Sequence, residues 1–324
     1  MSKKLVILLP RTLDQPPKVL EEASQLANVV ITRNSEDAAR ELKDAQGLFL
    51  WDFSSRLISD NPLPPALEWI HTASLGVDVV LTDTVVASDI VVSNTRGVFE
   101  RPIAEYVLGL LLVIAKDFRR TLAYQRDEIW QWRPTHLVAG QNVVLIGPGA
   151  VGKEIYTMLV AAGMTVLPVG RQAVSADSHF GKIYSTSEAA HLIPDADTVV
   201  LSLPLTSATR GFMSKDLIAK MKPDASFINI GRGGLVDEQA LIEALQAGRI
   251  GAAALDVFMQ EPLPKGHVLW KMDNVIVSPH MSGDTCGFVE LIAAQFMENL
   301  TRWSEGRAVH NVVDKEKLAA SNIK

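Results

Sequence analysis

The chain has 324 residues, of which 48% are apolar and 21% are charged. This composition is ordinary for a folded protein and excludes a disordered, collagen-like or coiled-coil chain, and the length predicts about two domains. Lysine and arginine number 31 against 37 aspartate and glutamate residues, a net charge of −6 with no basic block. This charge argues against nucleic acid or an anionic membrane as a partner.

The single cysteine and the short apolar runs predict a cytoplasmic protein. Cys286 cannot form an internal disulfide, and no Cys/His cluster has zinc spacing, so no metal site is expected. The apolar run at the N-terminus, Leu5–Leu9, is shorter than the core of a signal peptide. The longest apolar stretch, Ile103–Ala115, is shorter than a bilayer span and contains Glu105.

Residues 1–95 alternate short apolar runs with polar helical stretches such as Pro17–Ala27 and Glu36–Lys43. Because the runs are apolar on both faces, they predict a parallel sheet that helices cover on both sides. The expected strands are Leu5–Leu9, Val29–Thr32, Gly47–Trp51, Trp69–Thr72 and Ile90–Ser93.

Two helices are expected next, an apolar one over Ile103–Lys116 and a more polar one over Phe118–Trp130. A second alternating series then predicts a whole doubly wound sheet. Its six expected strands are Asn142–Ile146, Thr165–Val169, Thr198–Leu203, Ser226–Ile230, Ala252–Asp256 and Val275–Ser278.

The residues after Asp284 contain one amphipathic helix, Leu291–Trp303, and are too few for a domain of their own. We therefore expect them to return to the first domain, so that the second domain is inserted in the first. The predicted organisation is one α/β domain of residues 1–100 and 285–324, and another of residues 101–284.

A glycine-rich turn in the second half indicates a dinucleotide. Gly147-Pro148-Gly149-Ala150-Val151-Gly152 fits the pattern G-x-G-x-x-G between an expected strand and an expected helix over Lys153–Ala162. Such a turn lets the backbone approach a pyrophosphate, which then meets the N–H groups of the helix N-terminus. In other settings, repeated glycines in these turns serve close packing alone.

The next expected strand ends in Val169-Gly170-Arg171, where NAD-binding proteins usually have an acidic residue for the ribose hydroxyls. A guanidinium there matches a 2′-phosphate and supplies about 1.5–3 kcal/mol of charge-assisted hydrogen bonding. The sequence therefore favours NADP over NAD. The alternative is a solvated surface arginine beside a permissive pocket, and Pro168 leaves the register of this strand open.

Three polar residues follow expected strands of the second sheet, where ligands of open α/β sheets bind. These are Arg232 between glycines, Glu261 before a proline, and His280. A histidine transfers a proton, a carboxylate orients its ring and stabilises the charged form, and a guanidinium clamps a carboxylate and polarises a carbonyl. Each residue alone has an ordinary structural explanation, such as a surface turn or an ion pair with Asp237.

Together these residues carry a family resemblance. The series Ser226–Asp237, Ala254–Phe258, Glu261-Pro262 and Ser278-Pro279-His280 resembles the signature of the D-isomer-specific 2-hydroxyacid dehydrogenases. Further resemblance lies in Leu201–Thr206, Thr209–Gly211 and Thr72–Asp78, so the similarity spans nearly the whole chain. It implies two Rossmann-like domains, with the dinucleotide-binding domain inserted in the substrate domain.

The resemblance also implies roles for individual residues. His280 is expected to be the general acid in the reduction of a 2-oxo acid to a D-2-hydroxy acid, Glu261 its partner, and Arg232 the clamp on the substrate carboxylate and carbonyl oxygen. Leu75 and Gly76 are expected to hold the carboxylate through their backbone, with Trp51 beside the substrate. The implied cofactor site comprises Gly147, Gly149, Ala150, Val151, Gly152, Arg171, Leu203, Pro204, Thr209, Ile230, Asp256 and His280.

The sequence departs from the family pattern at Ser202, where many members have histidine, and at Arg171. Similar arginines mark the glyoxylate and hydroxypyruvate reductases of the family, which makes NADP the first expected cofactor and NAD the second. The choice of 2-oxo acid substrate is expected to depend on Trp51-Asp52-Phe53, Leu75, Phe99-Glu100-Arg101 and Met281. A homodimer is also expected, in which Trp130 or Trp132 could complete the partner's site.

Other functions remain open at this stage. A dinucleotide-sensing binding protein similar to a corepressor would keep the same residues, whereas a methyltransferase would need an acid in place of Arg171. Within the family, lactate, phosphoglycerate, formate and phosphite dehydrogenases are alternatives. The lack of an appended regulatory domain disfavours the larger phosphoglycerate enzymes.

Overall fold

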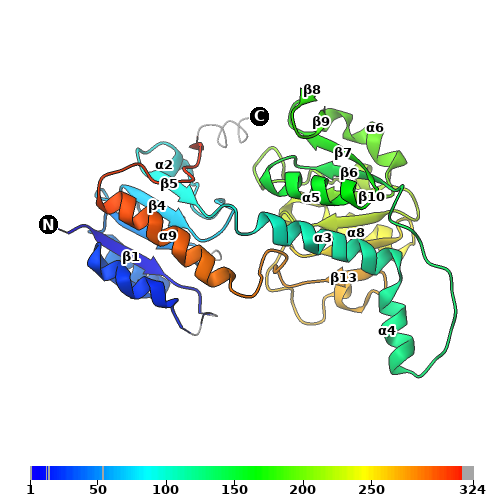
Figure 1. Ribbon diagram of the computed structural model, residues 1–324, viewed down its shortest axis with the longest axis horizontal. Helices are drawn as coiled ribbons and strands as arrows, with labels where there is room; N and C mark the ends of the chain where they lie inside the picture. The colour runs from blue at the N-terminus through cyan, green and yellow to red at the C-terminus, as the bar shows by residue number, and fades with distance from the viewer. Residues whose placement is uncertain (1, 12, 14, 53–54, 316–324) are drawn as a thin grey trace. The chain divides into compact units, whose positions relative to one another are not determined.

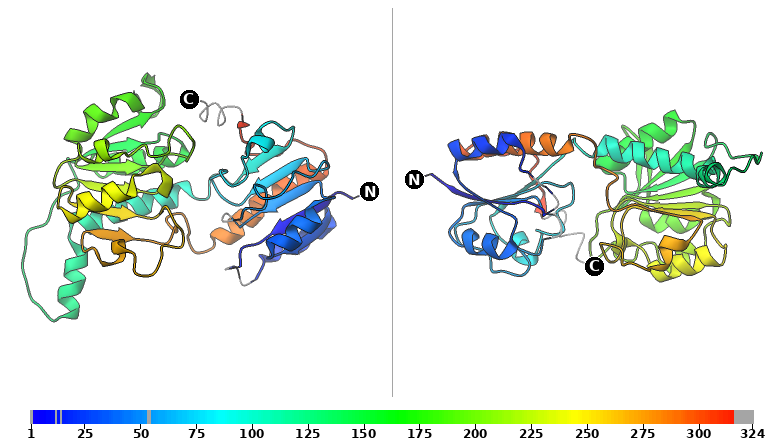
Figure 2. Two further views of the ribbon diagram at one scale, coloured as in Figure 1. Left: turned by 180° about the vertical axis from the view of Figure 1, so that it is seen from behind. Right: turned by 90° about the horizontal axis from the view of Figure 1, so that it is seen from below.

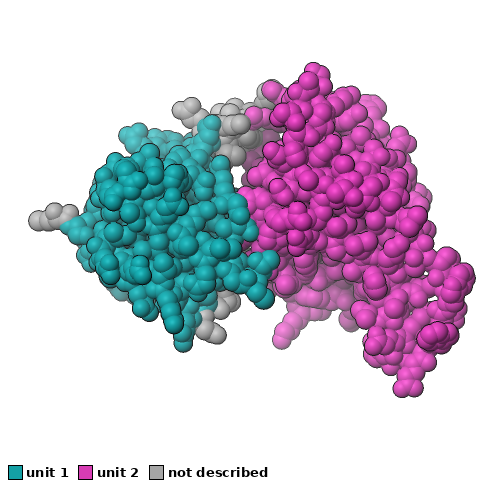
Figure 3. Space-filling model, in the orientation of Figure 1, with its two compact units in different colours: residues 1–98, 285–324 teal, residues 99–284 magenta. Residues whose placement is uncertain are grey.

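The structure is a computed structural model that describes residues 2–11, 13, 15–52 and 55–315. It divides into two compact units, which Figure 3 distinguishes by colour. Unit 1 comprises Met1–Val98 and Thr285–Lys324, and unit 2 comprises Phe99–Asp284. The chain thus leaves unit 1, builds unit 2 and returns to unit 1.

Unit 1 is built on a five-stranded sheet in which all neighbouring strands are parallel. Three of these strands are buried along nearly their whole length, as expected for a sheet covered on both faces. The strand order is β2 (Asn28–Thr32), β1 (Lys4–Leu8), β3 (Gly47–Leu50), β4 (Trp69–Thr72) and β5 (Val91–Asn94).

Helices cover both faces of this sheet (Figure 2). The 3-10 helix η1 (Lys18–Gln25) and α9 (Phe288–Ser304) lie side by side on one face, and α1 (Ser35–Leu42) packs against β1 and β2. The short helix α2 (Asp83–Val86) precedes β5. Because α9 comes from the C-terminal part of the chain, the core of unit 1 needs both ends of the sequence.

Aromatic rings join α9 to the sheet of unit 1. Phe296 is fully buried and stacks on Phe49 of β3, with ring centroids 3.8 Å apart. Trp69 of β4 stacks on the same ring at 5.8 Å. Fully buried aromatic pairs are among the largest contributors to a hydrophobic core.

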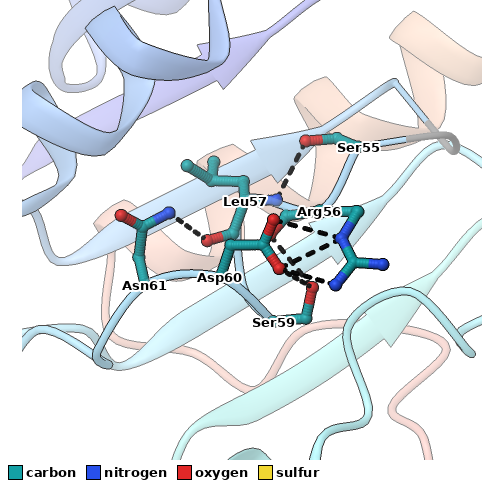
Figure 4. Close-up of polar contacts among 6 residues, drawn as sticks. All are labelled: Ser55, Arg56, Leu57, Ser59, Asp60 and Asn61. Carbon is teal, nitrogen blue, oxygen red and sulfur yellow. Dashed lines mark hydrogen bonds and ion pairs between the residues drawn. The ribbon is translucent and has the colours of Figure 1, made fainter.

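The loop 55–61 after β3 is fixed by local polar contacts, which Figure 4 shows. Arg56 forms a bidentate ion pair with Asp60, with Nε and Nη2 between 2.9 and 3.1 Å from the carboxylate oxygens. The Asn61 side-chain amide donates to the Leu57 carbonyl oxygen at 2.9 Å. These contacts hold the turn while Leu57 packs into the core.

Unit 2 contains an eight-stranded sheet in which β8 alone is antiparallel to its neighbour. The strand order reverses at β6, which lies between β10 and β7, and a reversal of this kind opens a crevice at the carboxyl ends of the strands. The order is β13 (Val275–Val277), β12 (Ala252–Leu255), β11 (Ser226–Asn229), β10 (Thr198–Leu201), β6 (Asn142–Ile146), β7 (Thr165–Gly170), β9 (Gly181–Ser185) and β8 (Val174–Asp177).

The helices α3 (Glu100–Ala115) and α5 (Ala150–Ala161) pack side by side in unit 2 (Figure 1). α4 (Phe118–Arg126) and the segment after it project from the body of the unit. The remaining helices are η2 (Thr186–Glu188), α6 (Ala189–Leu192), η3 (Ile193–Asp195), α7 (Lys215–Ile218), η4 (Gly233–Leu235), α8 (Glu238–Gln246) and η5 (Val268–Lys271). Among the described helices, none has the length and apolar character needed to cross a membrane.

The expected fold class, two parallel-sheet α/β domains, is confirmed, and two local predictions are wrong. The stretch Pro17–Ala27 is helical as expected and contains the 3-10 helix Lys18–Gln25. The helix expected over Phe118–Trp130 ends at Arg126. The second sheet has two strands more than the six expected, because β8 and β9 form a largely exposed edge hairpin in which Ile183 is buried. Such strands lack the apolar runs that identify buried ones.

Candidate active site

The carboxyl edge of the unit 2 sheet carries most of the predicted site residues. His280 follows β13, Asp256 and Glu261 follow β12, and Arg232 follows β11. Because these three strands are neighbours, their carboxyl ends meet at one edge. Farther along the same edge lie the loop 202–209 after β10, the glycine turn after β6 and Arg171 after β7.

The glycine turn has the geometry that a dinucleotide needs. Gly147 has φ +112°, and a Cβ there would lie 2.3 Å from the Ser202 carbonyl oxygen. A Cβ on Gly152 would lie 2.1 Å from the Gly147 carbonyl oxygen, whereas one on Gly149 would meet no atom within 4 Å. Gly147 and Gly152 are therefore required for packing, and Gly149 leaves the approach to the turn open.

The helix after this turn offers unoccupied donors. Gly149 is the N-cap of α5 and has no side chain to cap the helix, so the first-turn amides of Ala150, Val151 and Gly152 have no capping acceptor. The N–H groups and the helix dipole favour an anion such as a pyrophosphate. The turn thus fits the expected dinucleotide.

The other expected cofactor residues surround this turn. Arg171 is exposed and comes directly after β7, whose Val169 pairs with Ile146 before the glycine turn. Thr209 Oγ1 donates to the Pro204 carbonyl oxygen at 2.7 Å and accepts from the Thr206 N–H at 2.8 Å. Thr209 therefore shapes the loop that begins at Leu203, while Ile230 is buried directly after β11.

Asp256 organises the loop that carries His280. Its carboxylate is fully buried and accepts hydrogen bonds from Ser278 Oγ at 2.7 Å and from the N–H groups of Met281 and Ser282, both at 3.0 Å. The anchored residues bracket His280, whose φ of +53° lies in a region that residues other than glycine rarely adopt. Asp256 thus holds the strained backbone of the predicted acid.

Glu261 and His280 are in direct contact. Glu261 Oε2 lies 2.8 Å from His280 Nδ1, and the two side chains are 31% and 29% exposed. Glu261 Oε1 accepts the Phe258 N–H at 2.9 Å, which fixes the carboxylate. Burial acts to raise the pKa of Glu261, but the hydrogen bonds from His280 and Phe258 and the charge of Arg232 outweigh it and hold the pKa below its usual value. This pair leaves the imidazole Nε2 as the atom that can transfer a proton.

Arg232 is held by the turn around it. Its Nη1 donates to the Gly231 carbonyl oxygen at 2.8 Å, and its positive charge acts to lower the pKa of Glu261. A Cβ on Gly233 would lie 1.9 Å from the Phe258 carbonyl carbon, so the turn after β11 packs directly on the segment before Glu261.

Asn229 is a site residue that sequence analysis missed. It is buried at the end of β11, where its Nδ2 donates to the Arg232 carbonyl oxygen at 3.1 Å and its Oδ1 accepts the Gly231 N–H at 3.1 Å. Both ends of the arginine turn are thereby fixed. A polar residue at the carboxyl end of a strand, directly after the apolar Phe227 and Ile228, was the available signal.

The residues predicted to contact substrate from the first domain lie in unit 1. Leu75 and Gly76 form a turn after β4, and Trp51 follows β3. Trp51 is 6% exposed and its ring is tilted against Phe49 at 5.2 Å, so it packs in the core of unit 1. Phe53 lies outside the described residues.

The expected specificity residues of unit 2 differ in exposure. Phe99 and Glu100 are buried at the start of α3, and Arg101 is exposed and pairs with Glu105 at 2.9 Å. Met281 is 43% exposed beside His280, which leaves it accessible to a ligand.

Comparisons with known proteins agree with this arrangement. Residues 108–282 match the family model described as "D-isomer specific 2-hydroxyacid dehydrogenase, NAD binding domain". The chain is 30% identical to a glycerate dehydrogenase of Methylorubrum extorquens over 97% of this chain and all of that one. It is also 30% identical to a glyoxylate reductase of Aeropyrum pernix over 78% of each chain.

A solved structure extends the agreement to the whole fold. The NADPH-dependent glyoxylate/hydroxypyruvate reductase of Sinorhizobium meliloti, determined with NADP and sulfate, has a TM-score of 0.80 and 26% identity, covering 97% of this chain and 99% of that one. The resemblance expected from the motifs is confirmed, and the chain belongs to the family of D-isomer-specific 2-hydroxyacid dehydrogenases.

Proposed function

We propose that this chain is an NADPH-dependent reductase of small 2-oxo acids, with glyoxylate and hydroxypyruvate as its best substrates. As a member of its family, it is an oxidoreductase that transfers a hydride between a nicotinamide dinucleotide and a 2-oxo acid. The observation that carries the proposal is the Glu261–His280 pair, 2.8 Å apart on the sheet edge that also carries Arg232 and the glycine turn.

The cofactor preference rests on Arg171. The amides after Gly149 would bind the pyrophosphate, and the exposed guanidinium of Arg171 would bind the 2′-phosphate of NADP. NAD lacks this phosphate and would bind through the remaining contacts. The Sinorhizobium meliloti relative is an NADPH-dependent glyoxylate/hydroxypyruvate reductase by name, which supports the same preference.

The chemistry follows from charge. When bound, the dinucleotide would supply the hydride for the carbonyl carbon of the substrate. Arg232 stabilises the negative charge that develops on the carbonyl oxygen, and His280 donates a proton to that oxygen. Glu261, which is fixed by the Phe258 amide, orients the imidazole and stabilises its charged form.

Unit 1 would supply the substrate-binding residues. The backbone at Leu75 and Gly76 is assigned to the substrate carboxylate. We accordingly assign unit 1 as the substrate domain and unit 2 as the dinucleotide-binding domain.

The apolar surface of α4 and the segment 127–138 supports a homodimer. Leu122, Trp130, Trp132 and Leu137 are 62%, 101%, 82% and 72% exposed. Arg133 holds this segment against α4 through Nε to Asp117 Oδ2 at 2.8 Å. An ordered apolar surface of this kind is typical of a protein interface, and we assign a second copy of the chain as its partner. A mass measurement by light scattering should give two chains for the wild type and one for Trp132→Glu.

We also place the protein in the cytoplasm, where its single cysteine would stay reduced. The alternative function is that of a dinucleotide-sensing binding protein. Such a protein would use the same glycine turn to bind the dinucleotide but would catalyse no reaction.

The test is an NADPH-oxidation screen over glyoxylate, hydroxypyruvate, pyruvate, phenylpyruvate and branched 2-oxo acids. We expect the highest kcat/KM with glyoxylate or hydroxypyruvate. NADPH binding without turnover of any of these acids would contradict the reductase assignment and favour the binding protein.

A further inference from the structure

Four consecutive backbone amides follow β4 at the carboxyl edge of the unit 1 sheet. Within the described part of the chain, the N–H groups of Ser74, Leu75, Gly76 and Val77 donate to no acceptor. These residues are only half-buried, so a ligand can reach them. Adjacent backbone donors of this kind are suited to bind an anion.

Side chains hold three successive carbonyl groups of the same turn, those of Ser74, Leu75 and Gly76. Thr72 Oγ1 donates to the Ser74 oxygen at 3.3 Å, Asn94 Nδ2 to the Leu75 oxygen at 2.7 Å, and Ser74 Oγ to the Gly76 oxygen at 2.7 Å. A trans peptide is planar, and its N–H points opposite to its C=O. Fixing three successive carbonyl groups therefore fixes the directions of the next three N–H groups.

The Leu75 carbonyl has the most informative of these three contacts. Ser74 and Thr72 lie within two residues of the carbonyls that they hold, whereas Asn94 comes from the end of the neighbouring strand β5. Asn94 is only 4% exposed. The direction of the Gly76 N–H, an expected contact of the substrate carboxylate, therefore depends on a buried side chain outside the turn.

Arg96 determines which way the Asn94 amide faces. Arg96 Nε lies 2.9 Å from Asn94 Oδ1, and because a guanidinium only donates hydrogen bonds, the amide oxygen must face it. The NH₂ group must then face the Leu75 carbonyl. Gln295 of α9 fixes the backbone of Arg96 on both sides, accepting its N–H at 3.0 Å and donating to its carbonyl oxygen at 2.8 Å.

We propose that Asn94 is a positioning residue of the substrate site, which aims the Gly76 N–H at the carboxylate of the 2-oxo acid, and that Arg96 keeps the Asn94 amide in the required orientation. The inference rests on the proposed function and adds to it a residue that does not itself touch the substrate. With this role for Asn94, the turn after β4 binds the substrate carboxylate through backbone N–H groups and needs no charged side chain of its own.

The substitution Asn94→Asp tests this role with little change of shape. Aspartate keeps the oxygen that accepts from Arg96, but it places a second oxygen against the Leu75 carbonyl oxygen, so the peptide must turn away. We expect KM for hydroxypyruvate and the inhibition constant of oxalate to rise about tenfold to a hundredfold. The kcat and the Kd of NADPH should change by less than about threefold, because Asn94 contacts neither the reacting atoms nor the dinucleotide-binding turn. Arg96→Gln should shift KM in the same direction by a smaller factor.

Asn61→Asp is the matched control. The Asn61 amide also donates to a backbone carbonyl in unit 1, that of Leu57 at 2.9 Å, in the loop of Figure 4. The same chemical change at this position should leave KM and the oxalate inhibition constant within about twofold of the wild type.

Three results would overturn the inference. One is an unchanged KM and oxalate inhibition constant in Asn94→Asp, and another is an equal loss in Asn61→Asp. The third is a parallel fall in kcat and NADPH affinity, which would indicate general disruption. If the wild type reduces no 2-oxo acid, the proposed function fails instead, and calorimetry of oxalate binding then tests the role of Asn94. Weaker oxalate binding by Asn94→Asp than by the wild type supports the role. Equal binding by the two proteins, or binding by neither, contradicts it.

Discussion

The buried carboxylate of Asp256 holds the backbone of Ser282, whose N–H it accepts at 3.0 Å across 26 residues of sequence. The same carboxylate also accepts the Met281 N–H and the Ser278 hydroxyl, so it anchors the chain on both sides of His280. The position of the proposed acid is therefore set from the neighbouring strand β12.

Asp256→Asn should disrupt this anchor. In either orientation, the amide NH₂ would face at least one backbone N–H, which leaves buried donors unpaired. We expect the free energy of unfolding to fall by about 1–3 kcal/mol and kcat to fall more than about tenfold as His280 moves. Urea unfolding and steady-state kinetics measure the two effects. Asp216→Asn, an exposed position on α7, should change neither.

His280→Ala should reduce kcat by about 10²–10⁴-fold, because a positioned general acid contributes an effect of that size. The Kd of NADPH should change much less, since the glycine turn is intact. Steady-state kinetics measure the kcat, and a fluorescence titration measures the Kd of NADPH. Turnover near the wild-type level would remove His280 from the mechanism. His191→Ala, an exposed position on α6, is the control for loss of a histidine elsewhere in unit 2.

Arg171→Ala should lower kcat/KM for NADPH by about tenfold to a hundredfold, because a charge-assisted contact with the 2′-phosphate is lost. The kcat/KM for NADH should change by less than about twofold, because NADH has no 2′-phosphate. Arg249→Ala, which removes an exposed arginine after α8, should affect neither cofactor. A wild-type preference for NADH would refute the assignment of Arg171.

Unit 1 should lose stability in acid through His71. This residue is fully buried beside Phe296, and burial lowers its pKa from 6.5 to about 3. Below pH 6.5 the unfolded chain takes up a proton that the folded state rejects, so stability is lost as the pH falls from 6.5 towards 3. One proton corresponds to about 1.4 kcal/mol per pH unit.

The variant His71→Phe keeps an aromatic ring in this core and removes the titrating group. Between pH 7 and pH 5, the wild type should therefore lose about 2 kcal/mol more unfolding free energy than His71→Phe. Urea unfolding at the two pH values measures the difference. Equal losses in the two proteins would show that His71 does not govern the acid sensitivity of unit 1.

The sequence predicts the part of the site that depends on strand ends. Arg232, Glu261 and His280 each follow an apolar run, and the parallel order of the strands brings such residues to one edge. The glycine turn can also be recognised in the sequence, because its strand, turn and helix follow one another directly. These features need only local patterns and one rule of topology.

Contacts between segments that are distant in the sequence cannot be predicted from such local patterns. The bond from Asn94 to the Leu75 carbonyl depends on β4 and β5 being neighbours in a particular register, which no local pattern specifies. Trp51 packs on the ring of Phe49 in unit 1, and its expected place beside the substrate stays a prediction. The amide of Asn229 is recognisable only once the arginine turn is folded around it.

The central claim is that the chain transfers a hydride from NADPH to the carbonyl carbon of a 2-oxo acid. Incubation of hydroxypyruvate with NADPH deuterated at the transferable C4 position, followed by mass spectrometry and chiral separation of the product, tests it directly. The account predicts one deuterium on C2 of D-glycerate. Product without deuterium, product of the L configuration, or no product would contradict it.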